Sequence, residues 1–390
     1  MTDQISHQSR VDIGINAESP PGRLSVSVVM PTHNRADLLE KVVRKTHEYA
    51  TGFKIEWVIV DDGSSDHTPV VLAKLQLEIP SLRYVSVENR GPGQARNLGA
   101  SMARNEVILF MGDDIMPTDE DFLRSHAELH ASFQSKGVAV LGKALWPGTN
   151  QLNVNAVMRH IQGHGGEQFG YADLMAYRFY DWRFFYTCNI SLRRDAVDDW
   201  QKDGFSDKFS TYGFEDIEFA YRLSKRSGGF EIFYCPTSAG YHLHHYQVGA
   251  FIRRQTFAGA MAHVFLTMHP ELGSLIFVAD IQEAMNSPAG DGRDDVAPDY
   301  LAAIEGLKSW AKVLEHEQRL GTEAWHDDLL FIVFEVSYLQ GYVMHAAQAG
   351  TNFAKAYARI LQRAKMRLGR ILDSEIRNDP AFKARFMPHS

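Results

Sequence analysis

Two pairs of adjacent acids in the first third of the chain could do chemistry. Asp61 and Asp62 come directly after one apolar run, and Asp113 and Asp114 come one residue after another. Neighbouring carboxylates repel each other unless a cation or hydrogen bonds hold them. Turn chemistry explains the first pair about as well as a ligand does, because Asp, Gly and Ser close loops through local hydrogen bonds. For the second pair we favour a divalent metal that carries phosphates.

Two further segments carry candidate chemistry. Gly91–Gly99 is glycine-rich and precedes a predicted helix, so its backbone could approach an anion closely, although a plain loop-to-helix connection explains it equally well. Glu215 and Asp216 begin another predicted helix. Glu215 is explained as a partner of the helix dipole, whereas Asp216 could project into a cleft and act as a base.

Two histidines follow a late strand signal. His242 and His244 share one face of an extended segment, because side chains alternate along a strand. Such a pair is usually structural or solvated. The chain has only two cysteines, and a separate acid at Asp114, so one of these histidines could bind a metal or donate to a phosphate.

The elements that must position these residues alternate between strand and helix patterns. This alternation predicts an α/β fold of the Rossmann-like type, with a mainly parallel sheet and helices on both faces. Ligands bind at the carboxyl ends of the strands in such sheets, which is where the acids lie. The predicted strands are 26–30, 55–60, 82–87, 107–111 and 138–141, and the helices between them are 36–49, 68–77, 94–102 and 119–133.

The second half of the chain changes character. Aromatic residues accumulate in residues 146–186, and strand signals return at 187–192 and 230–234 with a helix at 214–225 between them. Almost everything after residue 248 is helical in pattern. We therefore predict a flexible tail (1–23), an α/β domain (24–270) with an insert at 146–186, and a helical region (271–390). The predicted helices from residue 248 onward are 248–268, 300–317, 324–348 and 353–372.

Composition excludes several classes of protein. The 390 residues carry a net charge of −8, which is a poor match for a general nucleic-acid binder. Two cysteines exclude a disulfide scaffold and a cysteine-based zinc site. The polar first 23 residues lack the apolar core of a signal peptide, and the apolar run 329–344 is interrupted by polar residues. We expect a cytoplasmic protein in which that run is a buried helix.

The C-terminal region is basic, unlike the rest of the chain. The predicted helix 353–372 has an apolar face and a face rich in Lys and Arg. We favour a bundle helix with a solvated basic face. The alternative is peripheral contact with anionic lipid at the inner face of the membrane. These helices also offer surface for a homodimer.

Seven motifs in order make the chain resemble glycosyltransferase family 2 enzymes with the GT-A fold. The resemblance covers about residues 25–260, and no single motif carries it. The motifs are 28–35, 58–66, 91–99, 107–114 with Pro117, 189–191 with Arg193 and Arg194, 213–223, and 236–242.

The resemblance implies a nucleoside-diphosphate-sugar donor and a hydroxyl acceptor that is a saccharide, a lipid-linked sugar or a small molecule. It implies that two groups of residues surround the donor. Pro31, Thr32, Asn34, Asp61 and Asp62 would line the base and ribose, and Arg35, Gly93, Ala95, Arg96, Asn97 and Asp113 would complete the nucleotide-sugar site.

The resemblance also implies the catalytic roles. Asp114 would be the last acid of the D-x-D motif and would hold a divalent metal together with His242, with His244 in reserve. A shell of carboxylate and imidazole suits Mn²⁺ better than Mg²⁺. Asp216, beside Glu215, would be the base, and the transfer would invert the anomeric centre by a single displacement.

The aromatic insert is the predicted acceptor side. Trp182 is the best candidate for a stacking platform, and Asn189 is a second candidate contact. A core-forming insert over the sheet edge explains the aromatic residues equally well.

The chain departs from the family pattern at several points. Gly112 stands where the D-x-D motif begins, and the Q-x-x-R-W motif of processive synthases is absent, which favours single transfers. Gly112 also supports an alternative function, that of a catalytically inactive protein that still binds nucleotide sugars. A sugar-phosphate nucleotidyltransferase is set aside, because Pro31 and Thr32 stand where its glycine-rich loop would be.

Overall fold

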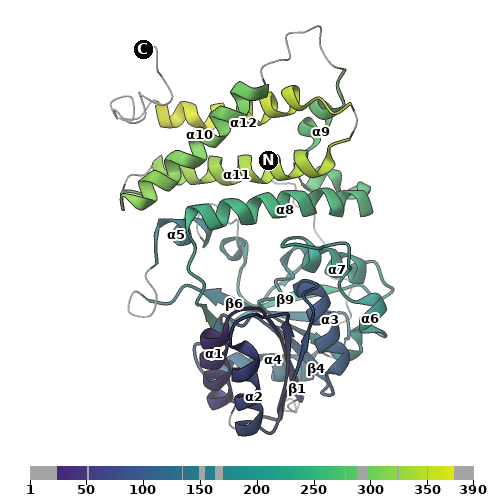
Figure 1. Ribbon diagram of the computed structural model, residues 1–390. Coiled ribbons are helices and arrows are strands. Elements are labelled where there is room, and N and C mark those ends of the chain that lie inside the picture. The colour runs from purple at the N-terminus through teal and green to yellow at the C-terminus, as the bar shows by residue number, and fades with distance from the viewer. Residues whose placement is uncertain are drawn as a thin grey trace. The chain divides into compact units, whose positions relative to one another are not determined.

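The computed structural model describes residues 24–50, 52–133, 135–148, 154–162, 170–276, 278–288, 297–322, 325–348 and 350–372. The described residues form two compact units (Figure 1). Unit 1 is drawn from Met1–Leu152, Gly170–Ser210 and Glu215–His244, and unit 2 from Asn153–Phe169, Thr211–Phe214 and His245–Ser390.

The predicted domain boundary at residue 270 is wrong. Unit 1 ends at His244, and α8 (Val248–Met268) belongs to the helical unit. The insert predicted at 146–186 is also divided, because its residues before Gly170 belong to unit 2 from Asn153 onward. The predicted tail at 1–23 lies outside the described residues.

Unit 1 is built on a nine-stranded mixed sheet among the described residues. Its strand order is β3-β2-β1-β4-β8-β6-β9-β5, with β7 paired to β9. The first four strands in this order are parallel, as the alternating pattern predicts, whereas β8 is antiparallel to both of its neighbours. The strands are β1 (Val26–Thr32), β2 (Ile55–Asp62), β3 (Leu82–Val87), β4 (Val107–Met111), β5 (Ile115–Pro117), β6 (Val138–Leu145), β7 (Phe179–Tyr180), β8 (Asn189–Arg193) and β9 (Glu231–His242).

Helices cover both faces of the parallel strands. Helices α1 and α2 pack on each other at one side, and α3 packs on β1 and β2 at the other (Figure 1). The helices of unit 1 are α1 (Ala36–Tyr49), α2 (Thr68–Glu78), α3 (Pro92–Met102), α4 (Asp121–Ser132), α6 (Trp200–Asp203) and α7 (Glu215–Ser224), with short 3-10 turns at Tyr171–Asp173, Trp182–Phe184 and Arg194–Ala196. This is the α/β architecture that the sequence pattern predicts.

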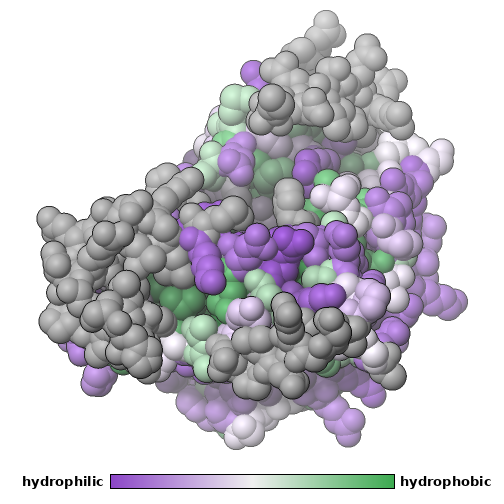
Figure 2. All heavy atoms as spheres, turned by 90° about the horizontal axis from the view of Figure 1, so that it is seen from above, coloured by the Kyte–Doolittle hydropathy of each residue, from purple (hydrophilic) through white to green (hydrophobic). Residues whose placement is uncertain are grey.

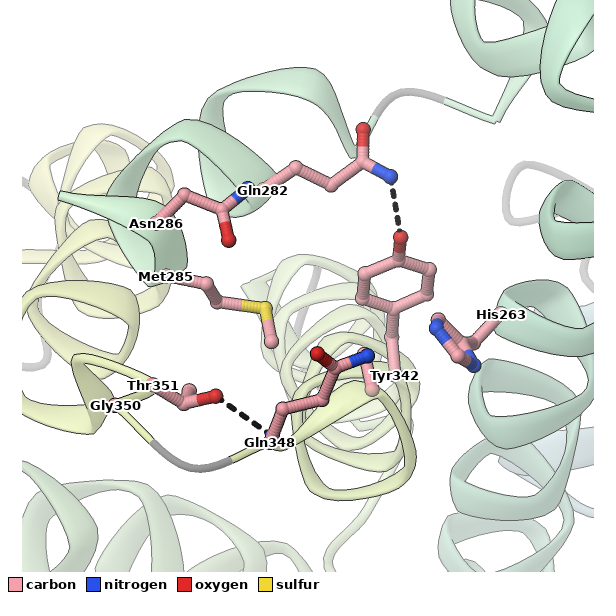
Figure 3. Close-up of a pocket in the computed structure, with 9 residues that line it drawn as sticks. His263, Gln282, Met285, Asn286, Tyr342, Gln348, Gly350 and Thr351 are labelled. Atoms are coloured by element: carbon pink, nitrogen blue, oxygen red, sulfur yellow. Dashed lines mark hydrogen bonds between the residues drawn. The ribbon is translucent and has the colours of Figure 1, made fainter.

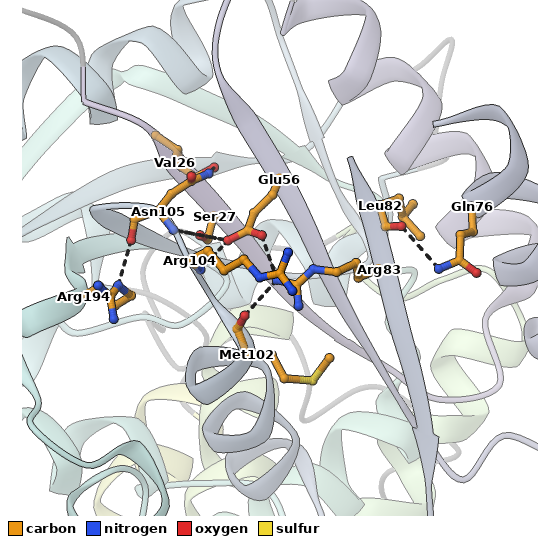
Figure 4. A network of polar contacts seen from close by, with 10 residues as sticks. All are labelled: Val26, Ser27, Glu56, Gln76, Leu82, Arg83, Met102, Arg104, Asn105 and Arg194. Atoms are coloured by element: carbon orange, nitrogen blue, oxygen red, sulfur yellow. Dashed lines mark hydrogen bonds and ion pairs between the residues drawn. The ribbon is translucent and has the colours of Figure 1, made fainter. Parts of the chain in front are cut away.

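A buried carboxylate, Glu56, joins the loops at the amino ends of the parallel strands (Figure 4). It accepts hydrogen bonds from the Ser27 hydroxyl at 2.6 Å and from the Asn105 backbone N–H at 3.2 Å, and it pairs with Arg83 at 2.7 Å. Burial opposes ionisation of Glu56, but the hydrogen bonds from Ser27, the Arg104 backbone and Arg83 lower its pKa. This edge of the sheet is tied together internally, and the opposite edge carries the candidate site.

Pairing in the sheet brings distant candidate residues to that opposite edge. Thr32 at the end of β1 is in register with Asp61 at the end of β2. Ile115 in β5 is in register with His242 at the end of β9, and the Leu243 backbone N–H donates to the Asp114 carbonyl at 2.8 Å. The ends of β1, β2, β4 and β9 therefore meet at one edge.

Unit 2 is helical. Its longest described helices, α8 and α11 (Trp325–Ala346), pack very closely where each presents a glycine. A Cβ added at Gly259 would lie 1.8 Å from the Tyr338 carbonyl oxygen, and one at Gly341 would lie 2.0 Å from that of Thr256. The remaining helices are α5 (Ala156–Gln162), α9 (Ala279–Asn286), α10 (Ala297–His316) and α12 (Phe353–Leu372), with a 3-10 turn at Pro270–Leu275.

The basic helix α12 is held by ion pairs within unit 2. Arg363 pairs with Asp280 of α9 and lies 3.7 Å from Glu335 of α11, and Arg367 lies 4.0 Å from Glu335.

Figure 2 shows the surface of the molecule from above. In this view hydrophilic residues occupy much of the centre, and hydrophobic residues form smaller groups beside them.

One described helix, α11, has a length and composition that would allow it to cross a membrane, and 61% of its most apolar window is buried in the structure. A core helix has these same properties, and α11 packs against α8 and α12.

A cavity of about 300 Å³ lies among α8, α9 and α11 in unit 2 (Figure 3). The Gln282 side-chain amide donates to the Tyr342 hydroxyl at 2.6 Å at its wall. His263 lies beside the same tyrosine, with ring centroids 5.6 Å apart.

Candidate active site

The loop after β1 is fastened to the loop after β2 by Asn34. This residue adopts a left-handed backbone conformation with φ of 53°. Its side-chain carbonyl accepts from the backbone N–H groups of Ser65 at 2.7 Å and Asp66 at 3.2 Å, and its own N–H donates to the Ser64 hydroxyl at 2.8 Å. Asn tolerates this conformation better than most residues, so the sequence can fix the loop here.

Asp61 and Asp62 are bound mainly by backbone groups. Asp62 accepts from the backbone N–H of Arg90 at 2.8 Å and of Gly91 at 3.0 Å, one with each oxygen. Asp61 accepts from the Ser64 backbone N–H at 3.0 Å and, with its other oxygen, from the Ser86 hydroxyl at 2.8 Å. The bond from Ser64 to Asp61 is the local turn chemistry that the sequence left open, whereas Asp62 holds a loop 28 residues further along the chain. Their predicted contacts with the base and ribose stay predictions.

Asp113 and Asp114 are bound by side chains instead. Arg35 lies against both carboxylates, 3.3 Å from Asp113 Oδ1 and in direct hydrogen bond to Asp114 Oδ2. The Thr32 hydroxyl donates to the other oxygen of Asp113 at 2.7 Å. Burial and the neighbouring Asp114 charge raise the pKa of Asp113.

Two histidines complete the cluster around Asp114. His242 Nε2 and His244 Nδ1 lie 3.4 and 3.5 Å from Asp114 Oδ2. Burial opposes ionisation of Asp114, but His242 and Arg35 together hold its pKa well below its usual range. The structure thus brings together the residues predicted to bind metal.

Trp146 stacks on His242, with ring centroids 5.1 Å apart and planes inclined by 13°. Sequence reasoning did not identify this residue as part of the site. It directly follows β6, so the rule that ligand-binding residues lie at strand carboxyl ends could have found it.

Gly112 is required by the position of Asp114. A Cβ at residue 112 would lie 2.8 Å from Asp114 Oδ1 and 3.2 Å from the Ile115 side chain. Any larger residue would therefore displace the Asp114 carboxylate or the strand that follows it.

The glycine-rich segment packs against protein more than the sequence predicts. Asn97 is buried, and its side-chain amide exchanges two hydrogen bonds with the Phe205 backbone, at 2.8 and 2.7 Å. Gly93 and Ala95 are also buried, and a Cβ at Gly93 would lie 3.2 Å from Phe205 Cβ. The prediction that the Asn97 side chain borders the donor is wrong, because both ends of its amide hold the Phe205 loop.

The remaining predicted donor residue of this segment, Arg96, reaches the acid that precedes the predicted base. Its guanidinium lies 3.3 Å from Glu215 Oε1, and both side chains are largely buried. This ion pair joins the start of α3 to the start of α7. Glu215 is therefore paired within the protein rather than only a partner of the helix dipole.

Asp216 follows Glu215 and is partly buried. Burial and the Glu215 charge raise the pKa of Asp216 to about 7, against the opposing effects of Arg96 and of hydrogen bonds from the Ile217 and Thr187 backbone. The Ile217 N–H lies 2.8 Å from Asp216 Oδ1. A carboxyl with this pKa is part-ionised near neutral pH, as a general base should be.

The charges of both acidic groups act on Cys188. Burial, followed by the charges of Asp114 and Asp216, raises the pKa of its thiol to about 12. Both carboxylates are therefore near enough to Cys188 to act on it electrostatically, and the backbone of Cys188 accepts from Gly112 at 3.0 Å.

The two predicted acceptor contacts differ. Asn189 is fully buried, where it donates to the Ser238 carbonyl at 2.8 Å and accepts from His126 Nε2 at 3.1 Å. The prediction that it contacts an acceptor is wrong, because both ends of its amide are used in the core. Trp182 is partly exposed and packs edge to face on Tyr221, so its role as a platform stays a prediction.

The residues at this edge suit part of a metal shell. Among the described residues, no group of three or more His, Cys, Asp or Glu side chains is arranged to hold a metal ion alone. Asp114 and His242 nevertheless offer a carboxylate oxygen and an imidazole nitrogen 3.4 Å apart. Mg²⁺ commonly takes one or two carboxylates and completes its shell with substrate phosphates. A phosphate-bearing ligand would have to do the same here.

This α/β unit carries a match to a known family. Residues 27–200, which include the sheet edge around Asp61, Asp114 and Asn189, match the model described as Glycosyl transferase family 2. That stretch, which is less than half of the chain, is therefore similar to the glycosyl transferase family 2 model.

Relatives with curated names include glycosyltransferases. A validoxylamine A glucosyltransferase of Streptomyces hygroscopicus subsp. jinggangensis is 28% identical over 231 residues, which cover 51% of this chain and 51% of that protein. The chondroitin synthase of Pasteurella multocida is 20% identical over 235 residues, covering 54% and 24% of the two chains. The chain spans about half the length of the glucosyltransferases that it matches.

Among solved structures, the chain is similar to a mannosyltransferase of Pyrobaculum calidifontis in complex with GDP-Man and Mn²⁺. The likeness has a TM-score of 0.48 at 16% identity and covers 93% of this chain and 84% of that one.

Proposed function

We propose that the protein is a metal-dependent, inverting glycosyltransferase that moves one sugar from a nucleoside-diphosphate sugar to an acceptor hydroxyl. The observation that carries this proposal is Asp216, whose pKa of about 7 suits a base, near the acidic cluster of Asp113 and Asp114. The reaction needs both Asp216 and the acidic cluster. Asp216 would activate the acceptor hydroxyl, and a metal bound at the cluster would stabilise negative charge on the leaving group.

The leaving group is the first chemical problem. Breaking the bond between sugar C1 and oxygen places negative charge on the departing nucleoside diphosphate. When bound by Asp114 and His242, a divalent cation would neutralise that charge, and their mixed oxygen and nitrogen donors favour Mn²⁺ over Mg²⁺. Asp113, which accepts a hydrogen bond from the Thr32 hydroxyl, would supply a second carboxyl group beside the metal site.

The acceptor hydroxyl is the second chemical problem. Asp216 would take the proton of the acceptor hydroxyl as that oxygen attacks C1 from the face opposite the diphosphate. The backbone N–H groups of Ile217 and Thr187 orient its carboxylate, and Arg96 holds Glu215 beside it. Attack from the opposite face inverts the anomeric centre in one displacement.

The direct test is Asp216→Asn. We expect transfer to fall to near background while the affinity for the nucleoside diphosphate is retained, because the amide keeps the shape but cannot take a proton. Asp207→Asn, at an exposed position on the loop before α7, is the matched control and should remain active. Normal turnover in Asp216→Asn would remove this residue as the base.

Donor and metal can be identified together. A thermal-shift screen of UDP, GDP, CDP and dTDP, each with Mn²⁺, Mg²⁺ or EDTA, should show one nucleotide that stabilises the protein only with a metal. Full transfer in EDTA would contradict the metal assignment.

An alternative is favoured by Gly112, which replaces the first acid of the D-x-D motif. A catalytically inactive protein that binds nucleotide sugars would give the thermal shift but no release of nucleoside diphosphate from the donor. A donor-hydrolysis assay therefore separates the two functions.

We further propose that α12 is a bundle helix of a cytoplasmic enzyme rather than a lipid-binding one. The ion pairs of Arg363 and Arg367 with α9 and α11 support this role. Flotation with anionic liposomes tests it, and binding to them would restore the membrane-peripheral alternative.

A further inference from the structure

Arg35 makes contacts that a metal ion at this site would also need. Its Nη1 lies against Asp114 Oδ2 and 3.3 Å from Asp113 Oδ1. Its Nη2 donates to His244 Nδ1 at 2.8 Å. A guanidinium has only donors, so this hydrogen bond uses the lone pair of His244 Nδ1.

The atoms that Arg35 occupies are the donor atoms of the candidate cation site. Asp114 Oδ2 is the oxygen that faces His242 Nε2 at 3.4 Å and His244 Nδ1 at 3.5 Å. An imidazole nitrogen binds a metal through the same lone pair that accepts a hydrogen bond. A guanidinium and a divalent cation therefore cannot hold Asp114 Oδ2 and His244 Nδ1 in this way at the same time.

The acid pair is held by a positive charge in the ligand-free protein. Asp113 and Asp114 are adjacent and only 8% and 9% exposed. Two buried neighbouring carboxylates repel unless a cation holds them. Arg35 supplies that cation when no ligand is bound.

Arg35 is also placed so that its side chain can move while its backbone stays. It directly precedes α1, and its carbonyl accepts from Leu39 N at 2.9 Å. Its neighbour Asn34 is fastened to the loop after β2 by four hydrogen bonds. The Arg35 side chain is 31% exposed, so rotation of its torsions alone can carry the guanidinium toward solvent or a phosphate.

We propose that Arg35 is an internal counter-ion that holds Asp113, Asp114 and His244 in the ligand-free protein and must release them before a divalent cation is bound. This inference rests on the proposed function, because it concerns the same edge of the sheet. The released guanidinium is then available to the diphosphate of the donor, since its planar donor set suits phosphate oxygens. Arg35 is thus a positioning residue that couples metal binding to donor binding.

Competition of this kind weakens metal binding in the absence of the donor. The apparent dissociation constant rises in inverse proportion to the fraction of molecules in which the site is open. If about a tenth of the molecules are open, removing the guanidinium tightens Mn²⁺ binding about tenfold.

The experiment compares Arg35→Gln with the wild-type chain by titration of Mn²⁺ alone, followed by EPR of free Mn²⁺. We expect about tenfold tighter Mn²⁺ binding in Arg35→Gln. Arg35→Lys keeps the charge but not the planar fork, and should fall between the two. Arg44→Gln is the matched control, since it removes a guanidinium from α1 whose partners are Glu40 and Glu78.

Two further measurements distinguish a change in metal affinity from a folding defect in Arg35→Gln. Thermal unfolding without metal should show Arg35→Gln less stable than wild type, and Mn²⁺ should raise its melting temperature by more than it raises that of wild type. Binding of UDP or GDP in saturating Mn²⁺ should instead be weaker in Arg35→Gln, because the phosphate contact is gone.

The outcomes separate the two proposals. Unchanged or weaker Mn²⁺ binding in folded Arg35→Gln, with wild type still binding a nucleoside diphosphate and Mn²⁺, overturns the role of Arg35 and leaves the proposed function standing. If neither protein binds Mn²⁺ or any nucleoside diphosphate, both proposals fail.

Discussion

The two acid pairs of unit 1 look alike in the sequence and differ in the structure. Asp61 and Asp62 end β2, and Asp113 and Asp114 follow β4, the two strands on either side of β1. The first pair is bound mainly by backbone N–H groups of the protein's own loops. The second is bound by the side chains of Arg35, Thr32 and the histidines.

This difference in hydrogen-bond partners predicts which acid pair supports the fold and which can bind a ligand. Backbone donors cannot leave without unfolding a loop, so carboxylates that they hold are part of the fold. Long or ionisable side chains can rotate away, so carboxylates that they hold can exchange partners with a ligand. Partner type therefore predicts which acid pair binds a ligand and which supports the fold, where sequence position does not.

The largest expected effect is on the exchangeable pair. Asp114→Asn should lower the transfer rate by about 100- to 1,000-fold, the range found when one group that stabilises transition-state charge is removed. The protein should remain folded, because Arg35 can turn to solvent. Rate measurements at saturating metal test this, with Asp37→Asn at an exposed position as the control. Activity within threefold of wild type would contradict the assignment.

The structural pair should respond in stability. Asp62→Asn removes the charge and one of two acceptors for the Arg90 and Gly91 N–H groups, which should cost about 2–3 kcal/mol of unfolding free energy. Urea denaturation measures it. If stability is unchanged while nucleotide binding is lost, Asp62 belongs to the site and the comparison between the pairs fails.

A third acid, Asp216, adds a pH dependence. Its pKa is raised to about 7, and only the ionised form can accept a proton, so kcat/KM should rise about tenfold per pH unit below 7 and level off above it. A pH–rate profile from 5.5 to 8.5 tests this, with nucleotide affinity over the same range as the control. A flat profile would exclude Asp216 as the titrating base.

The smallest effect concerns one hydroxyl. Ser86→Ala removes the side-chain donor to Asp61 and should lower the unfolding free energy by about 0.5–1 kcal/mol. Thr32→Val removes the corresponding donor to Asp113 and should instead change Mn²⁺ affinity. Calorimetric unfolding and Mn²⁺ titration of both variants would show whether the difference between the two acid pairs holds for single hydrogen bonds. If both substitutions lower stability equally and neither changes Mn²⁺ affinity, the difference does not hold.

Local patterns predicted most of the fold. The parallel strands and the residues that end them follow from apolar runs and polar breaks, which are properties of neighbouring residues. The meeting of Asp114 with His242 was expected from the family resemblance alone, and the antiparallel pairing of β5 with β9 brings it about.

Long-range partners explain what sequence reasoning missed. Asn97 was expected at the donor, but its amide is taken by the backbone of Phe205, 108 residues away. Asn189 is taken by Ser238 and His126 in the same manner. The boundary after His244 was also missed, because a helix pattern in α8 does not reveal which unit the helix joins.

The close approach at Gly112 couples the backbone at this position to the conformation of the Asp114 side chain. A Cβ at residue 112 would lie 2.8 Å from Asp114 Oδ1, so a larger residue would turn the Asp114 carboxylate or displace the strand that follows it. Turning that carboxylate would also change its contacts with Arg35, His242 and His244, so the size of residue 112 controls the geometry of the whole cluster.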